Sequence, residues 1–229
     1  MIFSQIPAGK NFVVFGDSVS AEETYDNRGK TYVDLIVRAL HGNLLRNYAI
    51  GGTTVTYMYQ GSNIEKEYGE NYVAIDGVRV ADMAFRKHEL DEVDVAFIQY
   101  GHNDQYFQPP LDQKEKNVED FSHIASFQES YRYIIHLLRK ANPAVQIILI
   151  NCTYSEYAAR SNQWPHVLTY FDYRRAIEEV ANEKNCFLID PWDYLQRYFD
   201  GKNEKHFYHD DVHLSPFGHE KLANFILQQ

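Results

Sequence analysis

Five short, continuous apolar runs limit what this chain of 229 residues can fold into. Runs of strand length that do not alternate with polar residues are typical of parallel strands covered on both faces, because a strand with one face in water alternates apolar and polar side chains. The runs lie at residues 12–15, 44–50, 93–100, 145–150 and 186–190.

Segments with helical periodicity lie between these runs, at residues 31–40, 131–140 and 168–183, and a last one closes the chain at 215–229. Apolar residues in them recur at the spacing of one helix face. Alternation of strands and helices favours a parallel sheet with helices on both sides. The sequence therefore predicts an α/β fold: a three-layer α/β/α sandwich around a central, mostly parallel five-stranded sheet.

Two of these helices carry start signals. Ser126 and Glu129 have the spacing of a capping box. Ser215 followed by Pro216 is typical of an N-cap and the first helical position.

We expect one domain over residues 1–229, with a surface elaboration at about 53–90. In that stretch Asp76-Gly77 stands between two short apolar pieces, which predicts a β-hairpin. The elaboration either borders a functional site or is a plain solvent-exposed excursion.

Composition excludes several classes of partner. The formal net charge is −10 and no Lys/Arg cluster stands out, which argues against nucleic acid and anionic membrane surfaces. No stretch approaches the roughly 20 apolar residues of a membrane span. The chain starts without the pattern of a signal peptide, so we expect a cytoplasmic protein. We expect Cys152 and Cys186, each beside an apolar run, to be free thiols.

The first apolar run stops abruptly at Gly16-Asp17-Ser18. On the plainest interpretation, Gly-Asp is turn chemistry and Ser18 caps a helix. The alternative is that the strand ends so that the Ser18 hydroxyl projects from the carboxyl edge of the sheet, where sites of parallel sheets collect. A serine nucleophile also needs a base, a group that orients the base, and an oxyanion hole.

Other polar blocks stand where they would reach the same edge. Each block has a structural alternative: loop flexibility for the glycines, an Asx turn for the Asn-Asp pair, and an ordinary exposed residue for the histidine. The blocks are Asn47 with Gly51 and Gly52 after the second run, Gly101 with Asn103 and Asp104 after the third, and Asp210, Asp211 and His213 before the last helix.

In this order the blocks resemble the SGNH, or GDSL, hydrolase superfamily, which is named for its Ser, Gly, Asn and His. The resemblance covers essentially the whole chain and implies a flavodoxin-like fold and a serine hydrolase that needs no cofactor and no metal. It implies Ser18 as nucleophile, His213 as general base and Asp210 as the carboxylate that orients the imidazole. By sequence alone, Asp211 competes with Asp210 for that last role.

The same resemblance implies an oxyanion hole made by the backbone N–H groups of Ser18 and Gly52 and the side-chain amide of Asn103. Residues 47–52 (NYAIGG) and 95–104 (VAFIQYGHND) look like the rhamnogalacturonan acetylesterase-like branch, although TTVTYMYQ at 53–60 departs from its pattern. This branch implies removal of acetyl groups from a carbohydrate, with a small-molecule or oligosaccharide ester as substrate.

Two alternatives stay open. One is a short-chain acyl esterase or lysophospholipase-like acylhydrolase. The other is a non-catalytic carbohydrate-binding protein on the same scaffold.

Aromatic and histidine residues near the expected site need separate treatment. We expect four aromatic side chains to border the substrate: Tyr57, Tyr106, Trp164 and Tyr208. We expect a structural role for His102. The histidines at 206, 209, 213 and 219 lack the spacing of metal ligands on one helix, so no metal site is predicted.

Overall fold

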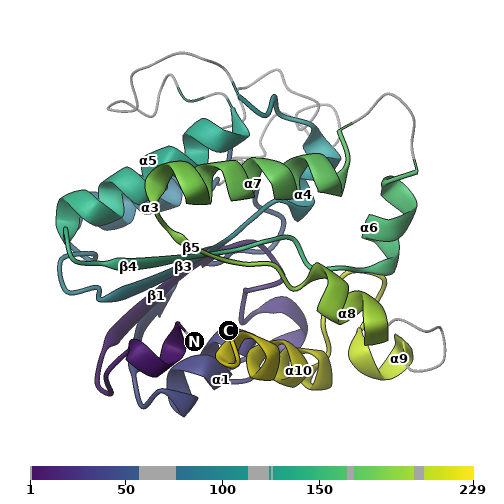
Figure 1. Cartoon of the computed structure of the whole chain (residues 1–229), viewed down its shortest axis with the longest axis horizontal. Helices are drawn as coiled ribbons and strands as arrows, with labels where there is room; N and C mark the ends of the chain where they lie inside the picture. The colour runs from purple at the N-terminus through teal and green to yellow at the C-terminus, as the bar shows by residue number, and fades with distance from the viewer. Residues whose placement is uncertain (1, 57–75, 113–123, 125, 164–167, 199–203) are drawn as a thin grey trace.

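The computed structural model describes residues 2–56, 76–112, 124, 126–163, 168–198 and 204–229. Its centre is a five-stranded, fully parallel sheet in the order β2-β1-β3-β4-β5, flanked by helices (Figure 1). The predicted α/β fold class is confirmed. The strands are β1 (Asn11–Gly16), β2 (Asn43–Asn47), β3 (Val95–Gln99), β4 (Gln146–Ile150) and β5 (Phe187–Ile189).

Burial along the strands explains the continuous apolar runs. All residues of β3 are buried, and so are those of β1 after Asn11, because both faces of the inner strands are covered by helices. Strand β2 lies at the sheet edge, is largely exposed, and ends at Asn47, earlier than the predicted run. Because β2, β1 and β3 are neighbours, their carboxyl ends lie side by side.

The helices form the two outer layers (Figure 1). Helices α3, α5 and α7 cover one face of the sheet, while α1 and α10 pack together on the other. The longer helices are α1 (Tyr32–Ala39), α3 (Gly77–Arg86), α5 (Phe127–Ala141), α7 (Tyr170–Lys184) and α10 (Pro216–Leu227). The shorter ones are η1 (Phe3–Gln5), η2 (Thr24–Asp26), α4 (His102–Phe107), α6 (Glu156–Ser161), α8 (Trp192–Tyr198) and α9 (Glu204–Phe207).

The hairpin predicted at Asp76-Gly77 is wrong. Asp76 is instead the N-cap of α3, and its carboxylate accepts a hydrogen bond from the Arg79 backbone N–H at 2.8 Å. Asp-Gly suits a helix start as well as a tight turn, so the dipeptide alone does not separate the two. Val78 and Ala81 are fully buried, so this part of the expected surface elaboration belongs to the core. Residues 57–75 lie outside the described part of the chain.

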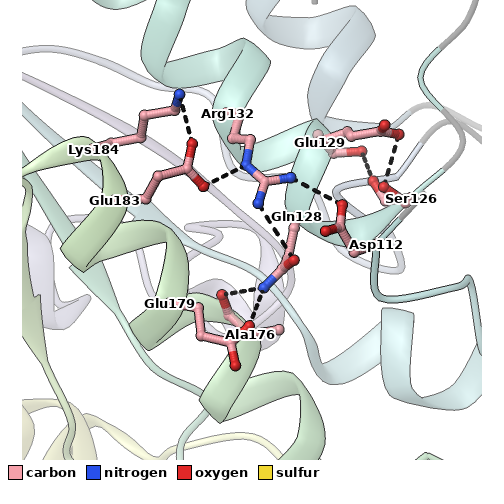
Figure 2. A network of polar contacts seen from close by, with 10 residues as sticks. Asp112, Ser126, Gln128, Glu129, Arg132, Ala176, Glu179, Glu183 and Lys184 are labelled. Carbon is pink, nitrogen blue, oxygen red and sulfur yellow. Dashed lines mark hydrogen bonds and ion pairs between the residues drawn. The ribbon is translucent and has the colours of Figure 1, made fainter. Parts of the chain in front are cut away.

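The capping predictions have different outcomes. Ser215 caps α10 as predicted, accepting from the Gly218 N–H at 3.2 Å, with Pro216 as the first helical residue. Ser126 occupies the N-cap position of α5, but its hydroxyl donates to the Glu129 carboxylate at 2.8 Å and does not cap the helix backbone (Figure 2).

A polar network ties α5 to α7 (Figure 2). The Arg132 guanidinium binds Glu183 on α7 at 2.8 Å, and Gln128 donates to Glu179 on the same helix at 2.7 Å. These contacts fix the layer that covers one face of the sheet. No helix in the described ranges is long and apolar enough to cross a membrane.

Candidate active site

Ser18 directly follows the turn that ends β1. The Asp17 backbone N–H still bonds to the Gln99 carbonyl of β3 at 3.2 Å, and the Asp17 carboxylate accepts from the Val19 N–H at 3.0 Å. Asp17 is completely buried, whereas Ser18 is half-buried at the carboxyl edge of the sheet. The turn chemistry expected of Gly16-Asp17 therefore serves to present the neighbouring hydroxyl.

The structure brings Ser18, His213 and Asp210 together. The Ser18 Oγ lies 2.9 Å from His213 Nε2, and His213 Nδ1 lies 2.7 Å from Asp210 Oδ2. The serine and the histidine are 195 positions apart in the chain. A hydroxyl, an imidazole and a carboxylate in this order can pass the serine proton to the ring while the carboxylate holds the ring's tautomer.

A tight loop before α10 fixes the histidine and its carboxylate. Tyr208 and Leu214 form an antiparallel bridge, and the His209 N–H donates to the His213 carbonyl at 2.8 Å. Asp210 Oδ1 accepts the backbone N–H groups of Val212 and His213 at 2.8 and 2.7 Å. Partial burial alone would raise the pKa of Asp210, but these bonds and the His213 ring hold it well below its ordinary value.

The geometry distinguishes between the two candidate carboxylates. Asp211 Oδ2 lies 2.5 Å from the Arg160 guanidinium on α6, and the Asp211 carbonyl accepts from the Tyr157 N–H at 3.1 Å. Of these two carboxylates, Asp210 is the one that contacts the His213 ring. Asp211 instead ties the loop to α6.

The residues expected for the oxyanion hole lie at the same edge. Gly52 is exposed and has φ +76°, a left-handed conformation that favours glycine. A Cβ on Gly51 would lie 3.8 Å from the Ser18 Cβ, which places the glycine pair beside the serine. Asn103 Nδ2 donates to the Thr53 carbonyl at 2.8 Å. Because an amide nitrogen carries two hydrogens, this bond orients Asn103 and leaves the second hydrogen to donate elsewhere.

Asp104 fixes the loop that follows the glycines. It is fully buried and accepts the backbone N–H groups of Val55 and Thr56 at 3.0 and 3.3 Å, together with the Thr56 hydroxyl at 3.0 Å. Burial nevertheless raises the pKa of Asp104 to about 7. Burial, with the Asp104 charge nearby, also raises the pKa of Asp17 to about 7.

These buried carboxyls predict a pH-dependent stability. The folded chain holds a proton on Asp104 that the unfolded chain releases near its ordinary pKa, so the free energy of unfolding falls as pH rises from about 4 to about 7. Asp104→Asn is expected to be less stable than the wild type at every pH. Between about pH 5 and about pH 8, its free energy of unfolding, measured in urea, is expected to fall by ~1–3 kcal/mol less than that of the wild type. Asp193→Asn, an exposed position on α8, is the matched control. An unchanged slope in Asp104→Asn would contradict the assignment.

The expected aromatic wall is only partly described. Tyr106 on α4 is 47% exposed, and its place beside the substrate stays a prediction. Tyr208 is 5% exposed and its hydroxyl donates to the Tyr154 carbonyl at 2.5 Å, so it packs inward and supports the loop. Tyr57 and Trp164 lie outside the described residues.

His102 is structural, as expected. It is buried, and its Nε2 accepts from the Thr153 backbone N–H at 3.2 Å. Burial, with the nearby His213 ring, lowers the pKa of His102 to about 3. In the part of the chain that the structure describes, no group of His, Cys, Asp or Glu has the arrangement of a metal site. Both cysteines are free.

Tyr25 makes a contact in the site that sequence analysis does not predict. Its hydroxyl donates to Asp210 Oδ2 at 2.7 Å, across 185 positions of the chain. Nothing in the local pattern around residue 25 points to the far end of the sequence, so only the folded arrangement reveals this contact.

Comparison with known proteins identifies the family to which this chain belongs. A family model described as GDSL-like lipase/acylhydrolase matches residues 14–221. No curated protein sequence is similar enough to count as a match.

Solved structures share the fold at low sequence identity. A protein from Lactobacillus plantarum superposes with a TM-score of 0.66 at 16% identity, covering 97% of both chains. The lipase/acylhydrolase from Enterococcus faecalis gives 0.58 at 20% identity, covering 96% of this chain and 94% of that one. A variant of an acetyl xylan esterase from Geobacillus stearothermophilus gives 0.59 at 21% identity, covering 97% and 95%. With the family model spanning nearly the whole sheet and both ends of the Ser18–His213 contact, the chain belongs to the GDSL-like lipase/acylhydrolase family and is an ester hydrolase.

Proposed function

We propose that this hydrolase removes acetyl groups from a carbohydrate through an acyl-enzyme on Ser18. The observation that carries the proposal is the continuous contact from Ser18 Oγ through the His213 ring to the Asp210 carboxylate, at 2.9 and 2.7 Å. A serine hydroxyl is a weak nucleophile until a base takes its proton, and the His213 Nε2 is within reach of that proton.

The reaction would run in two halves. Ser18 Oγ attacks the ester carbonyl carbon while His213 Nε2 takes its proton, and the oxyanion is held by the Ser18 and Gly52 N–H groups and the Asn103 amide. The C–O bond to the sugar then breaks, and His213 returns the proton to the leaving sugar oxygen. A water molecule, deprotonated by His213, attacks the acetyl-enzyme and releases acetate, and Ser18 recovers its proton.

Features around the serine support a small acyl group on a sugar. Gly51, which has no side chain, lies beside Ser18, and the exposed Tyr25 ring contacts the triad carboxylate Asp210 and stacks on His209 at a centroid distance of 4.5 Å. A flat exposed aromatic surface suits the apolar face of a sugar ring. The similar acetyl xylan esterase from Geobacillus stearothermophilus is named for acetyl groups on such a substrate.

A substrate panel tests the acyl preference. Acetylated xylooligosaccharides are compared with nitrophenyl acetate, butyrate and octanoate. We expect kcat/KM to fall by about tenfold or more from acetate to octanoate, since one added methylene that does not fit is worth roughly that factor. Activity that rises with acyl length would instead favour the lysophospholipase-like alternative.

A fluorophosphonate probe tests whether the protein is catalytic at all. We expect it to label wild-type protein at Ser18 and to leave Ser18→Ala unlabelled. Unlabelled wild-type protein that still binds acetylated sugars would favour a binding protein on the same scaffold.

Asn103→Ala tests the oxyanion hole. We expect kcat to fall by about 10²–10³-fold with a smaller change in KM, because the amide acts on charge that develops only in the transition state. The measurement is steady-state hydrolysis of nitrophenyl acetate, with Asn182→Ala, an exposed position on α7, as control. A variant that keeps most of its kcat would remove Asn103 from this role.

A further inference from the structure

The loop between Ser18 and α1 reaches across to the carboxylate of the candidate triad. Tyr25, in η2 of this loop, donates its hydroxyl to Asp210 Oδ2 at 2.7 Å. This is the same oxygen that lies 2.7 Å from His213 Nδ1. One carboxylate oxygen therefore receives two hydrogen bonds, one from the base and one from the segment that follows the nucleophile.

The ring of Tyr25 lies against the same group. It stacks on His209 with centroids 4.5 Å apart and planes at 20°, and it lies 5.7 Å from the His213 ring at 58°. Although the side chain is 53% exposed, its hydroxyl is directed at the carboxylate. The hydrogen bond with Asp210 raises the pKa of Tyr25, so the phenol stays protonated and remains a donor.

The backbone at this position is unusual. Tyr25 and Asp26 both have φ +53°, a left-handed conformation that costs free energy in residues other than glycine. Such a conformation persists where the surrounding contacts determine it. The contacts that Tyr25 makes with Asp210 and His209 are of that kind.

Asp210 is the charged group in direct contact with His213, because the other ionisable groups nearby are either paired elsewhere or neutral at pH 7. Asp211 is paired with Arg160, and burial lowers the pKa of His102 to about 3 and of His219 to about 4, so both rings are neutral at pH 7. The Asp210 carboxylate and the Tyr25 ring lie against the imidazole, and the His102 and His219 rings are near enough to interact with it by charge. The His209 ring stacks on Tyr25.

We infer that Tyr25 is a positioning residue for the triad, which orients the Asp210 carboxylate and withdraws part of its negative charge from the His213 ring. This inference rests on the proposed function, because it needs His213 to act as the base. Without the hydroxyl, the full charge of Asp210 would face the ring and stabilise its protonated form, in which His213 cannot accept the Ser18 proton.

Tyr25→Phe is the test, since it removes the hydroxyl and keeps the ring that stacks on His209. We expect the acid limb of the kcat/KM profile for nitrophenyl acetate to move up by about 0.5 pH unit, and kcat at pH 7 to fall by about three- to tenfold with KM little changed. Tyr25→Leu, which also removes the stacked ring, is expected to show the same shift and a larger fall in kcat.

Tyr48→Phe is the matched control. The Tyr48 hydroxyl also donates to a carboxylate at 2.7 Å, that of Glu89, but it has no contact with the triad. We expect its profile to match that of the wild type. Folded Tyr25→Phe and Tyr25→Leu proteins with wild-type pH profiles would overturn the inference. Failure of the proposed function is a separate result, because the wild type itself would then neither hydrolyse esters nor react with the fluorophosphonate.

Discussion

Ser18→Ala is expected to lower kcat for ester hydrolysis by about 10⁴–10⁶-fold while the protein stays folded. The hydroxyl is the atom that would form the acyl-enzyme, and no described neighbour offers a second nucleophile in contact with His213 Nε2. Ser18 is half-buried at the sheet edge and not part of the apolar core, so its loss removes little packing. Steady-state kinetics with nitrophenyl acetate, together with thermal unfolding by circular dichroism, measures both effects.

Ser20→Ala is the control for this variant. Ser20 lies on the same loop, but it is buried and its hydroxyl is hydrogen-bonded to Gln99 and Tyr32 at 2.6 and 2.8 Å. We expect Ser20→Ala to lose stability and keep most of its kcat.

His213→Ala is expected to match Ser18→Ala, and the double variant to be no worse than either, since the two groups act as one unit. Additive losses, or a Ser18→Ala protein with wild-type turnover, would contradict the mechanism.

Local pattern predicted the parts of the fold that local physics determines. The run at 12–15 is buried on both faces, and the α10 start at Ser215-Pro216 is a local backbone preference, so both are present in the sequence. The hairpin predicted at Asp76-Gly77 is wrong because the same dipeptide suits two local geometries, and the core packing of Val78 and Ala81 decides between them.

The site shows the same division. The strand ends that carry Ser18, Gly52 and Asn103 meet because β2, β1 and β3 are neighbours, and the motifs already indicated that edge. The contact of Tyr25 with Asp210 could not be predicted, because it depends on how a loop and the far end of the chain meet in space. Tyr208, which the sequence analysis places beside the substrate, is buried, and its hydroxyl donates to the Tyr154 carbonyl.

Asp210→Asn is expected to lower kcat by about 10⁴-fold, the loss typical when the triad carboxylate becomes an amide and the wrong imidazole tautomer is favoured. In the wild type both oxygens of the Asp210 carboxylate accept hydrogen bonds. Oδ1 accepts from the backbone N–H groups of Val212 and His213, and Oδ2 accepts from the His213 ring and the Tyr25 hydroxyl. An amide at this position has one NH₂ group in place of an oxygen. If the NH₂ group faces the backbone, it lies against the N–H groups of Val212 and His213, which are also donors, and the loop at 210–213 is strained. If it faces the ring, Nδ1 becomes the acceptor and Nε2 carries the hydrogen, so the imidazole can no longer take the Ser18 proton.

Asp211→Asn is the matched control for this prediction, because it also converts a carboxylate into an amide, one residue away. Asp211 contacts Arg160 at 2.5 Å and not the ring, so its variant is expected to lose at most a surface ion pair, worth ~0.2–1 kcal/mol of stability, and to keep its kcat. The two variants are compared by kcat and KM for nitrophenyl acetate at several pH values, with unfolding in urea as the check on the fold. Because adjacent carboxylates in one loop differ here only in what they contact, a large loss in Asp211→Asn with activity retained in Asp210→Asn would reverse the roles. In that case the carboxylate bonded to His213 Nδ1 would not be the group that sets the tautomer of the base.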